Sequence, residues 1–279
     1  MSPKPDARLN PAGLPVAYQG EPGAFSERAV LEMFGAQTGT LPCRSFRQVF
    51  TAVTGGQVRY GILPLENSLA GSILENYDGL LEHDVQIVAE CRLRVVHNLI
   101  ANRGVSLQEI RRIYAHPQAA AQCDRFLLQH PDWTLFQVYD TAGSVKMIRD
   151  EGCRDGAAIA GDTAASTYGM DVLLAGIEND PSNTTRFVVI SRPGETPAGT
   201  GKTTLVYGTR NEPGALLKTL EIFRDHGVNM TRLESRPIPG RPWEYLFYVD
   251  LVGTTGSALL DRLRRRTTRL KILGCYPEA

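Results

Sequence analysis

The sequence lacks features that would assign it to a membrane or to nucleic acid. No apolar run approaches the roughly 18 residues that a membrane-spanning helix needs, and the first residues lack the apolar core of a secretion signal. The formal net charge is zero, because 30 basic side chains balance 30 acidic ones. No global charge therefore attracts nucleic acid or an anionic lipid surface. We expect a cytoplasmic protein that binds neither.

Cysteine is also scarce. The five cysteines are odd in number and widely spaced, with no C-x-x-C pair, which argues against a disulfide framework or a zinc site. No G-x-G-x-x-G follows a predicted strand, so a dinucleotide-dependent dehydrogenase is disfavoured. The segment 201–204 resembles the end of a phosphate-binding loop, but Thr196 stands where that motif needs glycine. The arginine-rich run 262–266 is interpreted as the solvated face of a helix.

The apolar pattern predicts an α/β fold. The chain has 279 residues, of which 42% are apolar, enough for one large or two smaller domains. Short apolar segments bounded by Gly, Pro, Asp or His alternate with helical patterns, and we predict strands at 16–18, 60–63, 113–115, 135–139 and 157–160. Such alternation indicates parallel or mixed sheets covered by helices, with ligands beyond the carboxyl ends of the strands.

Composition divides the chain into four parts. Residues 1–14 hold three prolines and are expected to form a flexible arm. Glycine and proline gather near residues 193–202, which we interpret as a linker between a domain at 15–192 and a second at 203–279. The second domain reads βαββαβ, with strands predicted at 203–209, 228–237, 244–252 and 270–276, and helices at 212–226 and 257–268. Asn211 is the predicted N-cap of the first helix, and Gly227 follows its end.

Polar residues follow the predicted strands, where a ligand is expected. They occur in the segments GEPGAFSE, PLENSLAG, AHPQAAAQC and DTAGSVK, each of which has an ordinary alternative as a turn or helix cap. The helix after GEPGA offers free N–H groups that could receive a carboxylate. The run Asn183–Phe187 brings an amide, hydroxyls and a guanidinium to the start of another strand. That cluster suits an anionic substrate that loses an oxygen, although a polar turn is the simpler reading.

Taken together and in order, these segments resemble prephenate dehydratase. The matching pieces span nearly the whole chain and include VAYQGEPGAFSE, YGILPLENSLAG, AAIAGDTAASTYG and NTTRF, followed by EPGALLKTL and LESRP of a C-terminal ACT regulatory domain. The resemblance implies two α/β lobes similar to periplasmic binding proteins, with the substrate between them, and a ferredoxin-like ACT domain. It further implies conversion of prephenate to phenylpyruvate in phenylalanine biosynthesis, without metal or organic cofactor, in a homodimer or homotetramer.

The resemblance also implies roles for individual residues. Thr185 would donate a hydrogen bond to the departing hydroxyl, Asn67, Ser68 and Gln122 would orient the substrate, and Glu66 would organise its loop. Further substrate-binding residues would be Gly23, Ala24, His116, Phe187 and Arg186, although Arg186 could equally pair with a structural carboxylate. Phenylalanine, as allosteric effector, would bind Gly214, Ala215, Leu216, Asn229, Met230, Glu234, Ser235, Arg236 and Pro237.

Two departures from the family pattern leave alternatives open. Ala115 stands where the family usually has serine, so that hydroxyl's part would fall to Ser68 or to water. The loop GEPGA resembles that of enzymes that also accept arogenate, so an arogenate dehydratase or a dual-specificity enzyme is the main alternative. A nonenzymatic amino-acid sensor could share the architecture, but it would not need Glu66, Asn67, Ser68, Gln122 and Thr185.

Overall fold

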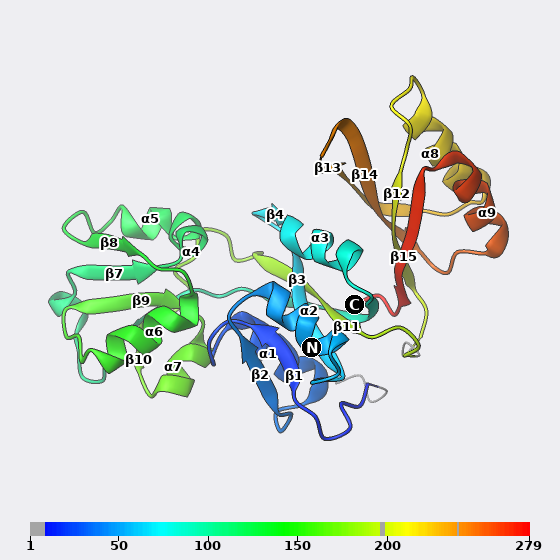
Figure 1. Cartoon of the computed structure of the whole chain (residues 1–279). Coiled ribbons are helices and arrows are strands. Elements are labelled where there is room, and N and C mark those ends of the chain that lie inside the picture. The colour runs from blue at the N-terminus through cyan, green and yellow to red at the C-terminus, as the bar shows by residue number, and fades with distance from the viewer. Residues whose placement is uncertain (1–8, 196–198, 239) are drawn as a thin grey trace.

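The computed structural model describes residues 9–195, 199–238 and 240–279, which form two lobes and a C-terminal domain (Figure 1). Residues 1–8 of the predicted arm and 196–198 of the predicted linker lie outside the described residues. Within the described part of the arm, Leu9 is buried in an apolar cluster that includes residues of both lobes. No described helix is long and apolar enough to span a bilayer.

The first lobe is a mixed sheet with helices on both faces. Its elements are β1 (Val16–Gln19), α1 (Phe25–Phe34), β2 (Thr40–Cys43), α2 (Phe46–Thr54), β3 (Tyr60–Asn67), β4 (Gly71–Ser72), α3 (Leu74–Glu82), β5 (Gln86–Arg94) and β11 (Thr184–Ser191). Strand β1 is parallel to β2 and β3, whereas β11 is antiparallel to β3 and β5. Apolar residues of α1 cover one face, and those of α2 and α3 cover the other.

The second lobe is inserted between β5 and β11. It comprises β6 (Asn98–Ala101), the 3₁₀ turn η1 (Leu107–Glu109), β7 (Arg112–Ala115), α4 (Pro117–Gln122), α5 (Asp124–Leu127), β8 (Thr134–Gln137), α6 (Thr141–Asp150), β9 (Gly156–Ala160), α7 (Asp162–Tyr168) and β10 (Asp171–Leu174). Its sheet has the order β10-β6-β9-β7-β8. The chain therefore crosses between the lobes twice.

The C-terminal domain has the predicted βαββαβ order. Its elements are β12 (Lys202–Gly208), α8 (Ala215–Asp225), β13 (Met230–Ile238), β14 (Arg241–Val252), α9 (Ser257–Arg266) and β15 (Arg269–Tyr276). The prediction of Asn211 as N-cap is wrong, because Gly214 occupies that position with a left-handed φ of 77°. The chain turns first, with the Ala215 N–H donating to the Glu212 carbonyl, and only then becomes helical. Gly227 follows the helix with a φ of 64°, as predicted.

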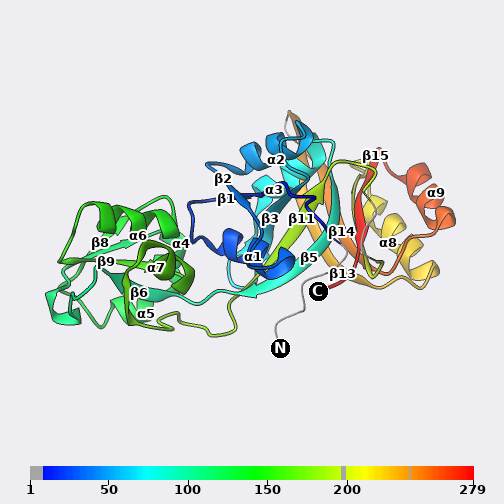
Figure 2. The same ribbon diagram turned by 90° about the horizontal axis from the view of Figure 1, so that it is seen from below.

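The C-terminal domain packs on the first lobe, at the opposite end of the molecule from the second lobe (Figure 2). Strand β15 lies beside β5 with Gly274 opposite Ile87, which joins the described strands of both domains into one sheet. The Tyr77 and Tyr248 rings lie 4.9 Å apart between their centroids, and the Tyr248 hydroxyl donates to the Tyr77 carbonyl at 3.1 Å. Helices α8 and α9 cover the other face of this part of the sheet.

Gly274 should be required for the junction of the two domains. A Cβ at this position would lie 2.3 Å from the Ile87 carbonyl oxygen, so alanine forces β15 away from β5. We expect Gly274→Ala to lower the free energy of unfolding by about 1–3 kcal/mol, the usual cost of overpacking. Thermal unfolding measures the effect. Gly39→Ala is the control, because its Cβ would meet only Pro15 atoms at 3.7 Å. Equal midpoints of thermal unfolding in the two variants would contradict the requirement for glycine at position 274.

Candidate active site

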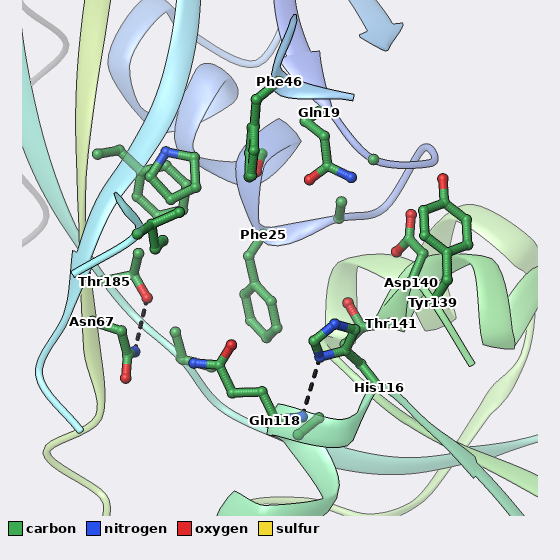
Figure 3. A pocket seen from close by; sticks show the side chains of 18 of the residues that line it. Gln19, Phe25, Phe46, Asn67, His116, Gln118, Tyr139, Asp140, Thr141 and Thr185 are labelled. Atoms are coloured by element: carbon green, nitrogen blue, oxygen red, sulfur yellow. Dashed lines mark hydrogen bonds between the residues drawn. The ribbon is translucent and has the colours of Figure 1, made fainter. Parts of the chain in front are cut away.

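A cavity of about 450 Å³ lies in the cleft between the two lobes. Figure 3 shows Thr185 and Asn67 on one wall and His116, Thr141 and Asp140 on the opposite wall, with the ring of Phe25 between them. The first wall belongs to the first lobe and the second wall to the second lobe. Both lobes therefore contribute polar side chains to one cavity.

The cavity is suited to an anion. Helices α1, α2 and α6 begin beside it, and the first N–H groups of a helix have no intrahelical partner. Helix α1 is N-capped by Ala24, which has no side chain to cap these groups. Arg44 is the only lysine or arginine among the described residues that line the cavity. Two carboxylates, those of Glu75 and Asp140, also line the cavity, and that of Asp140 accepts from the N–H groups of Ala142 and Glu21, each at 2.9 Å.

A β-bulge determines which side chains face the cavity. Thr185 pairs with Asn67 and Arg186 with Glu66, but Phe187 pairs with Pro64, so Leu65 is an extra residue on β3. Because side chains alternate along a strand, the extra residue moves Asn67 to the face that carries Thr185. Glu66 and Arg186 consequently lie on the opposite face, toward the C-terminal domain.

The hydrogen bonds around Thr185 leave its proton free. The Asn67 amide nitrogen donates to Thr185 Oγ1 at 3.0 Å and to Asn183 Oδ1 at 2.7 Å. The Asn67 oxygen accepts from the backbone N–H groups of Leu69 and Ala70, which fixes the orientation of the amide. No described residue accepts the Thr185 proton. Thr185 can therefore donate to a molecule in the cavity.

Gln122 supports this arrangement from behind Asn67 and does not itself line the cavity. Its Nε2 donates to Asn67 Oδ1 at 3.4 Å, and its Oε1 accepts from Asn183 Nδ2 at 3.0 Å. The Oε1 atom also lies 2.8 Å from His97 Nε2. Burial lowers the pKa of His97, although the contact with Gln122 and the charge of Glu178 oppose this shift. Asn183 and His97 are absent from the predicted site residues.

The structure places Arg186 and Glu66 outside the cavity. The Arg186 guanidinium donates to Glu90 at 2.7 Å, to Asp250 at 2.5 Å and to the Tyr276 hydroxyl at 2.9 Å. Pairing with structural carboxylates, the alternative left open for Arg186, is thus what the structure shows. Glu66 pairs with Arg232 of the C-terminal domain. We assign neither side chain a part in binding the substrate.

The other predicted residues divide between lining and support. Ala24, His116 and Phe187 line the cavity. Gly23 does not; its φ is 90°, and a Cβ there would lie 2.6 Å from Ala164 Cα, so glycine permits close contact between the lobes. Ser68 also lies outside the lining, with its hydroxyl accepting from the Thr184 N–H at 3.0 Å.

Ala115 lies in the apolar core of the second lobe and supplies no hydroxyl to the cavity. The hydroxyl-bearing side chains that line the cavity are those of Ser26, Ser45, Tyr139, Thr141 and Thr185. Thr141 lies on the same wall as His116 (Figure 3). Because Ser68 is outside the lining, these hydroxyls are better placed than Ser68 to meet a ligand.

The residues predicted to bind phenylalanine divide between two faces of the C-terminal domain. Ala215 and Leu216, which follow Gly214, line a cavity of about 170 Å³ together with Trp243, Tyr245 and Phe247. On β13, Glu234 accepts from Ser72 at 2.6 Å and Arg236 donates to Asp78 at 3.0 Å, so both side chains face the first lobe. Ser235, Pro237 and Asn229 are exposed, and Met230 is half-buried.

Comparison with known families agrees with this architecture. Residues 16–195 match the model of the prephenate dehydratase family, and residues 203–265 match that of the ACT domain. The chain therefore belongs to the prephenate dehydratase family and carries a C-terminal ACT domain. The predicted fold, a two-lobed domain of the periplasmic-binding-protein type followed by a ferredoxin-like ACT domain, is confirmed.

Individual relatives support the assignment. The chain is 38% identical over 271 residues to a bifunctional chorismate mutase/prephenate dehydratase of Pseudomonas aeruginosa, covering 95% of this chain and 74% of that one. It is 39% identical to arogenate dehydratase/prephenate dehydratase 2 of Arabidopsis thaliana, covering 94% and 72%.

Two solved structures are similar over nearly their whole length. A prephenate dehydratase from Arthrobacter aurescens in complex with L-Phe is 30% identical, with a TM-score of 0.87, and covers 95% of this chain and 90% of that one. GqqA, described as a novel type of quorum quenching acylase, is 37% identical, with a TM-score of 0.86, and covers 95% and 98%.

Proposed function

We propose that the cavity between the lobes converts prephenate to phenylpyruvate and that phenylalanine regulates this reaction through the ACT domain. The observation that carries the proposal is the Thr185 hydroxyl at the cavity, which accepts a hydrogen bond from Asn67 and donates to no other described residue. In the reaction the bond between the ring and its carboxylate breaks, and its electron pair enters the ring. The ring hydroxyl leaves and, with one proton, becomes water. Aromatisation makes the reaction favourable.

Thr185 would assist the departing oxygen without acting as a free acid. A hydroxyl side chain has too high a pKa to give up its proton outright, but a positioned O–H donor stabilises charge as it develops. Because Thr185 Oγ1 accepts a hydrogen bond from the Asn67 amide, the Thr185 proton would point away from that amide and into the cavity. A solvent proton would then complete the water molecule.

The two substrate carboxylates have different requirements. The side-chain carboxylate survives into the product, so Arg44 and the uncapped N–H groups of α1 can hold it throughout. The ring carboxylate must lose its charge as carbon dioxide. The apolar rings of Phe25, Phe46 and Phe187 line the cavity and solvate an anion poorly, which favours its loss.

The Thr185 hydroxyl should be essential for turnover. We expect Thr185→Ala to lower kcat about a hundredfold or more, because one preorganised donor is typically worth that much. Steady-state kinetics with prephenate measure the change. Thr184→Ala is the matched control, since its hydroxyl donates to the Ser182 carbonyl and does not line the cavity. Wild-type turnover by a folded Thr185→Ala protein would remove Thr185 from the mechanism.

Substrate choice should extend to arogenate, the amino relative of prephenate. Gly20 and Ala24 of the GEPGA loop line the cavity, and a relative is named for both activities. We expect prephenate to yield phenylpyruvate and arogenate to yield phenylalanine at a measurable rate. Incubation with each substrate and identification of the products tests this. Absence of any product from arogenate would restrict the enzyme to prephenate, and absence from both would refute the dehydratase assignment.

Acyl hydrolysis is a second candidate, because GqqA covers so much of the same fold. A hydroxyl nucleophile needs a neighbouring base. Among the described residues, the Thr185 hydroxyl contacts the Asn67 amide and no imidazole or carboxylate. The geometry therefore disfavours Thr185 as the nucleophile of an acyl transfer, and incubation with an N-acyl amide would test the alternative.

Regulation would begin at the small cavity of the ACT domain. Its rings of Trp243, Tyr245 and Phe247 suit an aromatic side chain, and the beginning of α8 suits a carboxylate. Leu233 of β13 and Tyr245 of β14 are exposed, and β13 is the edge strand of the sheet that the structure describes, so we propose that a second subunit packs there in a homodimer or homotetramer. A cytoplasmic location remains a prediction.

The contacts of β13 with the first lobe should transmit the effect of phenylalanine. We expect Asp78→Asn to reduce inhibition at saturating phenylalanine, because the change weakens the Arg236 ion pair without touching the effector cavity. Activity with and without effector gives the inhibition, and calorimetry shows whether phenylalanine still binds. The control is Glu244→Gln, whose carboxylate pairs only with the exposed Arg241 among the described residues. Full inhibition in the Asp78 variant would exclude this contact from the coupling.

A further inference from the structure

His97 lies between β5 and β6, at the crossing from the first lobe to the second, and lines the cavity while only 3% exposed. We propose that His97 is a positioning residue, which acts through Gln122 to orient the amides that hold Thr185. The proposal rests on the proposed function, because the reaction it serves is the dehydration. It assigns His97 no contact with the substrate.

The hydrogen bonds select one tautomer of His97. Its Nε2 lies 2.8 Å from Gln122 Oε1, whereas its Nδ1 is buried and has no partner among the described residues. A neutral imidazole carries one proton. On Nδ1 that proton would be a buried, unsatisfied donor, which is costly, whereas on Nε2 it makes a bond to Gln122. Burial also lowers the pKa of His97, which keeps the ring neutral.

The Nε2–H tautomer is consistent with a single orientation of each side-chain amide in the network. Gln122 turns its oxygen to His97 and Asn183, so its nitrogen faces the Asn67 oxygen. The reverse orientation of Gln122 would bring two amide oxygens together, because Leu69 and Ala70 already fix the Asn67 oxygen. His97 therefore donates to Gln122, Gln122 donates to Asn67, and Asn67 donates to Thr185. The Thr185 hydroxyl can then donate its own proton to a molecule in the cavity.

Two further contacts hold the imidazole in place. The backbone N–H of His97 donates to Glu178 Oε2 at 3.0 Å. The ring meets Phe25 edge to face, with 5.8 Å between centroids. Phe25 itself lines the cavity. His97 is thus fixed on both sides and can act as the first donor of the series.

Two substitutions distinguish the role of His97 Nε2 from that of Nδ1. Glutamine places an amide nitrogen near the position of Nε2, whereas the shorter asparagine places its polar group near Nδ1. We expect His97→Asn to lower kcat about five- to tenfold, the value of one neutral hydrogen bond, with KM changed less than about twofold. His97→Gln should recover most of the lost kcat. Full kcat in His97→Asn, or equal losses in both variants, would overturn the proposal.

A second measurement does not depend on turnover. The sequence has five histidines, so His97→Gln identifies the His97 signals in nitrogen NMR spectra. We expect the wild-type protein to show a protonated Nε2 and a bare Nδ1, and the opposite tautomer would overturn the proposal. An inactive wild-type protein would count against the proposed function, whereas an active one with an unaffected His97→Asn variant counts against His97 alone.

Discussion

The buried guanidinium of Arg186 fixes the relation between the two functional parts of the molecule. It bonds to Glu90 of the first lobe and to Asp250 and Tyr276 of the ACT domain, while Lys202 supplies a second cation to Glu90. Two cations thus face two carboxylates in a space nearly closed to water. Such groups require one another, since removing one partner of a buried pair typically costs about 3–5 kcal/mol. The ACT domain therefore has a defined position relative to β11.

That position matters because Arg186 follows Thr185 in the chain. The two side chains point to opposite faces of β11, one to the ACT domain and one to the cavity. Strand β3 repeats the arrangement, with Glu66 bonded to Arg232 and Asn67 facing Thr185. A displacement of the ACT domain would reach Thr185 and Asn67, the pair we propose to be catalytic, because each is the chain neighbour of a residue bonded to that domain. Regulation then requires only that phenylalanine bind two arrangements of the domains with different affinity.

The sequence predicted the helices and strands of the ACT domain well. It predicted less well on which face of a strand each side chain lies. Apolar segments and glycine-rich turns are local signals, so the βαββαβ order and the convergence of Thr185 and Asn67 could be predicted. The outward facing of Glu66 could not, because it depends on the bulge at Leu65, which only pairing with β11 reveals. Arg186 looked like a substrate ligand because its partners Asp250 and Tyr276 lie in the other domain. His97 was missed, because a lone histidine between two strands has no pattern until the fold brings Gln122 to it.

The catalytic network that we propose consists of neutral groups, and the reaction explains why. A cation beside the ring carboxylate would stabilise the charge that has to leave, and so would slow decarboxylation. A carboxylate beside the departing hydroxyl would repel the negative charge that develops there. Amides and a hydroxyl avoid both effects, because they donate to oxygen without carrying net charge. Burial keeps His97 neutral in the same way. The permanent charges of Arg186, Glu90, Asp250 and Lys202 are confined to the far side of β11, where they hold the ACT domain and leave the cavity free of them.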